Sequence, residues 1–425
     1  MHRLTQSLAG LVVLAALSAG NTGMAATITL SCGAVGIELE LCREGAEAWA
    51  AQSGHQVKVV STPNSTTERL ALYQQLLAAK ASDIDVFQID VIWPGLLATH
   101  LEDLGPHLGD SHGAHFSTIV DNNTVDGRLV AIPWFASVGV LYYRKDLLDK
   151  YGESPPATWD ELAATAARIQ EAERAAENKD LWGYVWQGRA YEGLTCNALE
   201  WLASEDAGTV VSRDGKVTVN SPQAVKAIDR AAGWVGSISP RGVLNYAEEE
   251  ARGVFQSGNA VFMRSWPYAW SLAQQEDSPV RGRVGVAPLP AGTASNGHAA
   301  ALGGWQLALS RYSRHPAEAA DLIRFLTSAP EQKRRAIRAS LNPTIPALYE
   351  DRDILAAAPF FSELIDIFNG AVARPSTVTG SRYNQVSSAF WNAVHQVLAG
   401  NKTAEASLEA LERRLKRLSR GGRGW

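Results

Sequence analysis

Strand-like and helix-like segments alternate along this chain, and this alternation restricts the possible fold more than any other feature. Two short apolar runs, 28–30 and 57–60, flank a helical pattern, and Asp85–Ile89 is typical of a buried parallel strand. Strands that alternate with helices predict an α/β protein whose sheets are covered by helices. Ligands of such sheets bind beyond the carboxyl ends of the strands, which is where Asp90 falls.

The same alternation continues through the rest of the chain. Runs at 129–134 and 138–142 predict two further strands. Capping boxes or a proline in the first turn predict the starts of four helices, at Ser65–Glu68, Thr158–Glu161, Ser221–Pro222 and His315–Pro316. Because we find no internal repeat and no long linker, a second domain would require the chain to cross back and forth between two lobes.

The N-terminal segment has the three parts of a secretory signal. Arg3 gives a positive start, Leu8–Leu17 form a short apolar run, and Gly23–Ala25 supply the small residues that signal peptidase requires. The apolar run is too short to span a bilayer. We therefore expect residues 1–25 to be a cleaved signal peptide and the mature chain to be periplasmic.

Composition and charge favour a globular protein that does not bind nucleic acid. The 425 residues are 46% hydrophobic and 20% charged, which is enough for two cores, and the formal net charge is -5. The C-terminal tract is basic, but Leu408, Leu411, Leu415 and Leu418 recur there at helical spacing. This spacing predicts an amphipathic helix whose charged face meets water.

The three cysteines leave one without a partner if a disulfide forms. Cys32 ends a strand-like run and Cys42 lies early in the next helical pattern, so a ten-residue loop brings them within bridging distance. In an oxidising compartment we expect a Cys32–Cys42 disulfide and a free Cys196. Three buried thiols remain the alternative, because pairing cannot be derived from sequence alone.

Two segments place tryptophan next to glycine or proline, namely Arg264–Trp270 and Leu302–Trp305. An indole beside residues that interrupt regular structure is typical of a loop rim, where its flat apolar face can meet a ligand. In a secreted protein this suggests a sugar site. The alternative is that both indoles belong to the core.

Longer strings resemble a known family. Gly139–Leu148 followed by Thr158–Leu162, and Phe255–Ala260, are similar to signatures of the extracellular sugar-binding proteins of ABC importers. Four further segments resemble the trehalose/maltose-binding branch of that family: Val185–Leu194, Arg264–Trp270, Gly285–Pro290 and Leu302–Trp305.

The resemblance implies a type II periplasmic binding protein fold, with two α/β lobes joined by hinge crossings around a ligand cleft. Lobe 1 would comprise residues 26–136 and 303–345, and lobe 2 residues 137–302 and 346–425. A family member captures its sugar in the cleft and delivers it to ABC transporter permease subunits. We accordingly expect a monomeric binding protein without catalytic activity, cofactor or resident metal.

The resemblance also assigns roles within the cleft. Charged side chains would bond sugar hydroxyls, indoles would pack on the rings, and Gly304 would let the backbone approach. The expected sugar-binding residues are Glu38, Arg69, Asp90, Phe135, Ser137, Tyr191, Glu192, Trp266, Gly304, Trp305 and Arg374. Glu40 competes with Glu38, Asp90 is also suited to cap a helix, and Arg374 is also compatible with an ordinary surface position.

One position departs from the family pattern. Archaeal trehalose/maltose-binding relatives carry Tyr and Asp after the proline of the crossing strand, where this chain has Phe135 and Ser137, preceded by Trp134. The loss of a phenol and a carboxylate changes the hydrogen bonds available to one glucose unit. Trehalose is the first expected ligand and maltose the second, with sucrose or another α-glucoside as the alternative.

Two other classes of function have to be weighed. A secreted glycoside hydrolase would need two facing carboxylates, such as Glu38 with Asp90 or Asp90 with Glu192. A metal site would have to be built from His107, Asp110, His112 and His115, although their spacing matches no standard zinc pattern.

Overall fold

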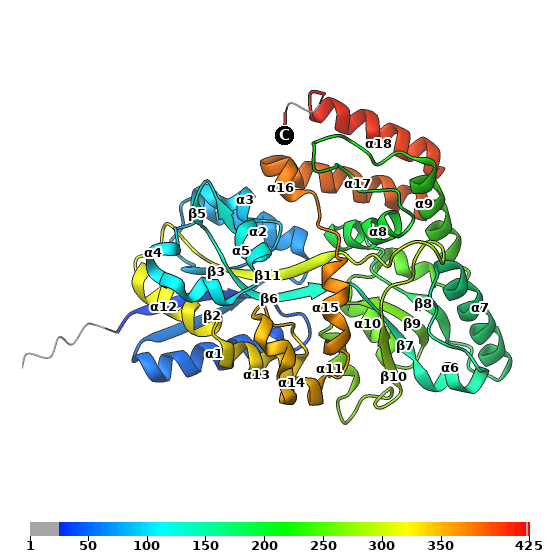
Figure 1. The fold of residues 1–425 in the computed structure, drawn as a ribbon, viewed down its shortest axis with the longest axis horizontal. Helices are drawn as coiled ribbons and strands as arrows, with labels where there is room; N and C mark the ends of the chain where they lie inside the picture. Colours follow the sequence, from blue (N-terminus) through cyan, green and yellow to red (C-terminus); the bar gives the residue numbers. More distant parts are fainter. Residues whose placement is uncertain (1–24, 422–423) are drawn as a thin grey trace, which may run out of the picture.

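The computed structural model describes residues 25–421 and 424–425, which form two α/β lobes side by side (Figure 1). The first lobe is built on a five-stranded sheet. Its strand order is β2 (Gln56–Ser61), β1 (Thr27–Cys32), β3 (Val86–Asp90), β11 (Leu302–Leu309) and β6 (Ile132–Val138). β1 is parallel to β2 and β3, whereas β11 is antiparallel to β3 and β6. The expected signal peptide lies outside the described residues, apart from Ala25.

The second lobe is built on a four-stranded sheet. Its order is β10 (Val284–Ala287), β7 (Val140–Arg144), β9 (Ala260–Ser265) and β8 (Trp182–Val185). β8 is parallel to β9, and β7 is antiparallel to β9 and β10. A short ribbon joins β4 (Thr124–Val125) to β5 (Arg128–Leu129). The predicted α/β fold with two lobes is therefore confirmed.

Helices surround both sheets (Figure 1). The first lobe carries α1 (Glu38–Ser53), α2 (Thr66–Ala78), α3 (Pro94–Leu97), α4 (Gly105–Leu108), α5 (Ser117–Asn122), α12 (Pro316–Leu326) and α13 (Ala329–Ala339). The second carries α6 (Lys145–Tyr151), α7 (Trp159–Ala175), α8 (Glu192–Ser204), α9 (Pro222–Trp234), α10 (Glu248–Gln256), α11 (Ala269–Ala273), α17 (Tyr383–Leu398) and α18 (Ala404–Leu418). The remaining helices are α14 (Arg352–Ala357), α15 (Phe361–Asn369), α16 (Ser376–Thr379), and the 3-10 turns η1 (Ala98–His100), η2 (Gly109–Ala114), η3 (Arg241–Asn245), η4 (Pro346–Glu350) and η5 (Gly380–Arg382).

The predicted helix starts are confirmed, and side-chain caps explain three of them. Ser65 Oγ accepts a hydrogen bond from the Glu68 amide (3.4 Å) and Thr158 Oγ1 from the Glu161 amide (3.2 Å). Ser221 caps α9 in the same way (3.1 Å), and α12 begins at the expected proline. These bonds satisfy amides that the first helical turn leaves without partners.

The predicted strands at 129–134 and 138–142 have the wrong boundaries. The first is split between β5 and β6, and the second is interrupted at Gly139, with β6 ending at Val138 and β7 starting at Val140. A Cβ atom on Gly139 would lie 2.1 Å from the Glu200 carboxylate. Only glycine therefore lets the chain pass this buried carboxylate on its way from one sheet to the other.

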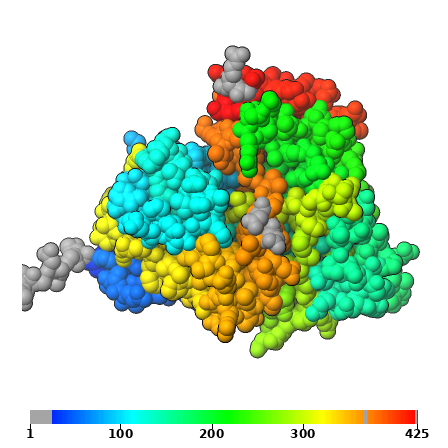
Figure 2. All heavy atoms as spheres, in the orientation of Figure 1, coloured from blue at the N-terminus to red at the C-terminus, as the bar shows by residue number. Residues whose placement is uncertain are grey.

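Three segments pass between the lobes next to each other. β6 and β11 pair through Val138 with Leu302 and Ser137 with Gly303, and Val372 forms a bridge with Ala301. In the space-filling view the two lobes are separate masses, with part of the C-terminal third between them (Figure 2). The exact lobe boundaries, 26–136 with 303–345 and 137–302 with 346–425, stay predictions.

The predicted disulfide is confirmed. Cys32 at the end of β1 is bonded to Cys42 in α1, with 6.5 Å between the Cα atoms. Cys196 is a free buried thiol, and burial raises its pKa to about 12. The bridge joins the first strand to the helix that carries Glu38.

The C-terminal basic tract forms the amphipathic helix α18, as predicted. Leu408, Leu411 and Leu415 are buried, and Arg413 and Lys416 are exposed and pair with acidic residues one turn earlier. None of the helices among the described residues has the length and hydropathy needed to cross a membrane.

Candidate functional site

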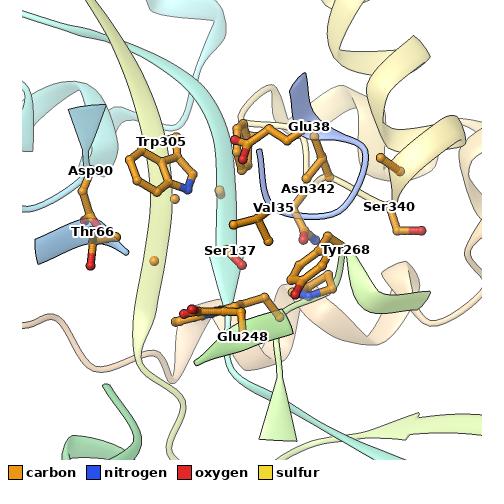
Figure 3. A pocket seen from close by; sticks show the side chains of 18 of the residues that line it. Val35, Glu38, Thr66, Asp90, Ser137, Glu248, Tyr268, Trp305, Ser340 and Asn342 are labelled. Atoms are coloured by element: carbon orange, nitrogen blue, oxygen red, sulfur yellow. The ribbon is translucent and has the colours of Figure 1, made fainter. Parts of the chain in front are cut away.

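A cavity of about 880 Å³, part of it open to solvent, lies between the two lobes, and side chains from both lobes line it (Figure 3). All expected sugar-binding residues line this cavity except Arg69 and Tyr191: Glu38, Asp90, Phe135, Ser137, Glu192, Trp266, Gly304, Trp305 and Arg374. Their contact with a sugar stays a prediction. Arg69 and Tyr191 are buried behind residues that line the cavity.

A buried ion network forms one end of the cavity. Arg374, on the segment that follows α15, donates to Asp90 Oδ1 (2.7 Å) at the end of β3 and to Glu192 Oε1 (3.0 Å) at the start of α8. Arg374 is therefore not an ordinary surface arginine. Burial raises the pKa of Glu192, and the positive charge of Arg374 opposes that shift.

Helix α17 holds the Glu192 carboxylate from behind. Tyr383 donates to Oε1, and Ser387 donates to Oε2 (2.7 Å). Asp90 also accepts from the Ile92 amide (3.2 Å), so it both stabilises the turn after β3 and binds Arg374. The sequence analysis missed Tyr383 and Ser387, because nothing local relates α17 to α8.

The two tryptophans that line the cavity each have an arginine against one ring face. Arg69 Cζ lies 4.2 Å from the Trp305 ring centroid, and Arg264 Cζ lies 3.9 Å from that of Trp266. A cation on one face of an indole is attracted by the ring quadrupole and fixes the ring, so a ligand would meet the opposite face. Both indoles are partly exposed, which argues against the alternative that they are core residues.

The predicted loop position is correct for one tryptophan and wrong for the other. Trp266 directly follows β9, whereas Trp305 lies inside β11 next to an irregularity in its pairing with β6. Gly304 has φ +130°, and a Cβ atom there would lie 2.7 Å from the Phe135 carbonyl oxygen. The glycine thus allows β11 to pack closely on β6, and this packing turns Trp305 toward the cavity.

Glu38, and not Glu40, faces the cavity. Glu38 is buried at the start of α1 and accepts from Gln88 Nε2 (2.5 Å). Burial raises its pKa, and the positive charges of Arg69 and Arg335 oppose this. Glu40 is exposed and bonds to Arg338 (2.8 Å). The crossing strand supplies no such charge, because its residues at the cavity are Phe135 to Ser137.

Glu248 is a cavity carboxylate that the sequence analysis missed. It begins α10, is half-buried, and accepts from Tyr191 Oη (2.8 Å) and Trp266 Nε1 (3.5 Å). Burial raises its pKa. An acidic residue at a helix start normally indicates only a favourable interaction with the helix dipole, so the sequence held no specific signal for this position. Tyr191 holds Glu248 in place from behind the cavity.

The histidine-rich turn does not assemble the alternative metal site. His115 Nδ1 lies 2.7 Å from Thr344 Oγ1, and His112 Nδ1 lies 2.6 Å from the Gly109 carbonyl oxygen. Burial, with a smaller effect of His112, lowers the pKa of His115 to about 4. Across residues 25–421 and 424–425, no three potential ligands among His, Cys, Asp and Glu gather in one place.

Comparisons with known proteins agree with this geometry. A model of the bacterial extracellular solute-binding proteins matches residues 42–333. A probable ABC transporter-binding protein of Deinococcus radiodurans is 53% identical over 412 residues, 96% of this chain and 97% of that protein. The maltose-bound MalE3 of T. maritima superposes with a TM-score of 0.88 at 43% identity, covering 93% of this chain and 100% of that one. The GacH receptor of Streptomyces glaucescens shares the fold, with a TM-score of 0.80 at 23% identity over 93% and 99% of the two chains. The chain therefore belongs to the family of bacterial extracellular solute-binding proteins.

Proposed function

We propose that this protein captures a glucose disaccharide in the periplasm and delivers it to an ABC transporter permease. The observation that carries the proposal is the cavity itself, where two indoles and the ion network of Asp90, Arg374 and Glu192 converge from both lobes. Sugar rings have apolar faces and polar edges, so they require this combination of partners. The maltose bound by the T. maritima relative supports a disaccharide.

Contacts between the lobes support a mechanism in which the ligand favours a closed state. Arg189 of the second lobe donates to Glu68 of the first (2.9 Å), and the Glu192 amide donates to Thr67 Oγ1 (3.3 Å). A disaccharide that touches both lobes would stabilise the arrangement in which these contacts form. The permease would then recognise the closed protein.

A calorimetric screen of the purified mature protein tests the proposal. We expect one saturable site for trehalose or maltose, with sucrose as the next candidate, and much weaker heats with glucose or mannitol as controls. Small-angle scattering should show a smaller radius of gyration when the site is filled. If no α-linked disaccharide binds, the proposed ligand class is wrong.

The rival proposal, a glycoside hydrolase, is less well supported by the carboxylates. Asp90 and Glu192 share one arginine, and Glu38 accepts a hydrogen bond from Gln88, so each of the three carboxylates is already bonded to another side chain of the protein. We expect no free glucose after incubation with trehalose or maltose. Release of glucose over many turnovers would favour the hydrolase.

Export and oligomeric state are part of the proposal. The expected cleavage after Ala25 would leave a mature chain that begins at the residue before β1. N-terminal sequencing of the exported protein checks the cleavage position. Size-exclusion chromatography with light scattering checks the expected monomer.

A further inference from the structure

The cavity contains one buried side-chain amide for which the described part of the protein supplies no hydrogen bond. Asn342 is 1% exposed and lines the cavity, and neither Oδ1 nor Nδ2 has a hydrogen-bond partner. Its polar neighbour Tyr349 donates its hydroxyl to the Pro343 carbonyl (3.0 Å). Burial raises the pKa of Tyr349, and a polar interaction with the Asn342 side chain, outside regular hydrogen-bond geometry, opposes this rise. Buried amides without partners are rare in folded proteins, so this one requires an explanation.

The backbone fixes Asn342 beside the crossing strand. The Ala136 amide donates to the Asn342 carbonyl oxygen (2.9 Å), which places Asn342 opposite the segment between Phe135 and Ser137. Figure 3 shows Asn342 with Tyr268 on one side of Ser137, whereas Asp90 lies on the other side, beyond Trp305. Asn342 and the ion network therefore occupy opposite ends of the cavity.

Several other residues that line the cavity are poor hydrogen-bond partners for a sugar. Tyr268 already donates its hydroxyl to Glu249 (2.7 Å). Apolar side chains also line the cavity: Val35, Ile37, Phe135, Leu272 and Leu341. A neutral amide offers two donors and one acceptor, which suits a pair of adjacent hydroxyls. Unlike a carboxylate, it does not bring a second buried charge into this end.

We infer that Asn342 is a specificity-determining residue that bonds hydroxyls of the sugar ring farther from Asp90. The inference rests on the proposed function, because it requires a ligand that reaches both ends of the cavity. The ion network fixes the first ring, and Asn342 distinguishes ligands by the hydroxyls of the second. A monosaccharide held at the Asp90 end does not reach the amide.

The variant Asn342→Leu tests this inference, because it preserves the side-chain size and removes both hydrogen-bonding atoms. We expect the Kd for the disaccharide that the wild-type protein binds best to rise by about tenfold or more, the loss expected for one unpaired partner. Any measurable affinity for glucose should change by less than about threefold, a difference well below one such bond. Asn392→Leu, on an exposed face of α17, is the matched control and should bind as wild type.

Stability without ligand separates a binding role from a structural one. Because no protein group among the described residues forms a regular hydrogen bond with the amide, Asn342→Leu should leave the Tm of the unliganded protein unchanged or raise it. Wild-type affinity in this variant, or weaker binding together with a lower unliganded Tm, would overturn the inference. If the leucine variant does not fold, Asn342→Asp keeps the acceptor, and unchanged disaccharide affinity in that variant would overturn it as well.

The wild-type titration keeps the two proposals apart. If the wild-type protein binds no disaccharide, the proposed function fails before any variant is compared. If the wild type binds and Asn342→Leu binds equally well, only the role of Asn342 is wrong.

Discussion

The two arginine–tryptophan pairs beside the cavity have similar geometry but different support. Arg264, which stacks on Trp266, is held by Glu200 through two hydrogen bonds of 2.5 and 2.9 Å. Arg69, which stacks on Trp305, has no hydrogen-bond partner for Nη1 or Nη2 within the described residues. One guanidinium is therefore neutralised by a direct ion pair, whereas the other is buried without one.

This difference shows which part of the site is complete before a ligand arrives. Among the described residues, Arg69 donates through Nε alone, to the Pro63 carbonyl (3.1 Å), and its charge interacts with Glu38 without a direct hydrogen bond between the two side chains. A buried polar group without a partner costs free energy, and a ligand or an ordered water that supplies the missing hydrogen bonds lowers this cost. The Trp266 side is thus preformed, and the Trp305 side depends more on what occupies the cavity.

The largest expected effect is on the free energy of unfolding when each of the two guanidinium groups is removed in turn. Arg264→Met leaves the Glu200 carboxylate buried without its ion pair, and breaking such a pair typically lowers the free energy of unfolding by about 3–5 kcal/mol. Arg69→Met breaks no ion pair, so we expect less than half of that loss. Denaturant unfolding of the unliganded variants measures both values. Equal losses would contradict the distinction between the two pairs.

The next largest effect concerns disaccharide affinity when the indole of Trp305 is removed. Trp305→Ala should weaken disaccharide binding by about 2 kcal/mol or more, roughly thirtyfold, as for a buried aromatic anchor. Trp182→Ala is the matched control, because Trp182 also has an arginine 4.2 Å from its ring but does not line the cavity. Calorimetry that shows equal affinities, with normal melting of both variants, would remove Trp305 from the binding site.

Local patterns predicted the elements of the fold, because their causes lie within a few residues. Ser65 and Thr158 start helices through bonds to amides three residues later, and Cys32 lies ten residues from Cys42. Gly139 is the contrasting case. The sequence predicts a continuous strand over 138–142, whereas the chain passes there from one sheet to the other beside Glu200, which is far away in the sequence.

The contacts within the site could be predicted only in part, for the same reason. Arg374 bonds to Asp90 across 284 positions of sequence, so family resemblance named both residues but no local pattern paired them. Glu248 and Asn342 face the cavity because α10 and the segment after α13 fold back beside it. Neither has a local signature that differs from that of an ordinary polar residue.

A smaller loss of disaccharide affinity should follow when Asp90 is removed from the ion network. Asp90→Ala leaves Arg374 with Glu192 alone, and an unpaired charged partner typically weakens binding by about 1–3 kcal/mol. We therefore expect at least about tenfold weaker affinity for the preferred disaccharide. Asp121→Ala, at an exposed position of α5, is the control. Wild-type affinity in Asp90→Ala would mean that Asp90 only stabilises the turn after β3.

The smallest effect concerns the preformed side and its dependence on pH. Burial raises the pKa of Glu248 above its ordinary value of 4.5, and the hydrogen bond from Tyr191, with a smaller effect of the positive charge of Arg264, opposes this only in part. The folded protein therefore holds this proton more tightly than the unfolded chain does. The stability that the carboxyl group contributes is complete below the unfolded pKa and is lost as the pH rises through the folded pKa.

Glu248→Gln resembles the protonated form and still accepts from Tyr191. We expect this variant to melt at a higher temperature than wild type at about pH 7 and at nearly the same temperature at about pH 4. Glu250→Gln, an exposed neighbour in the first turn of α10, is the control. A lower Tm for Glu248→Gln at neutral pH would contradict this expectation, because it would show that the ionised carboxylate stabilises the Trp266 side of the cavity.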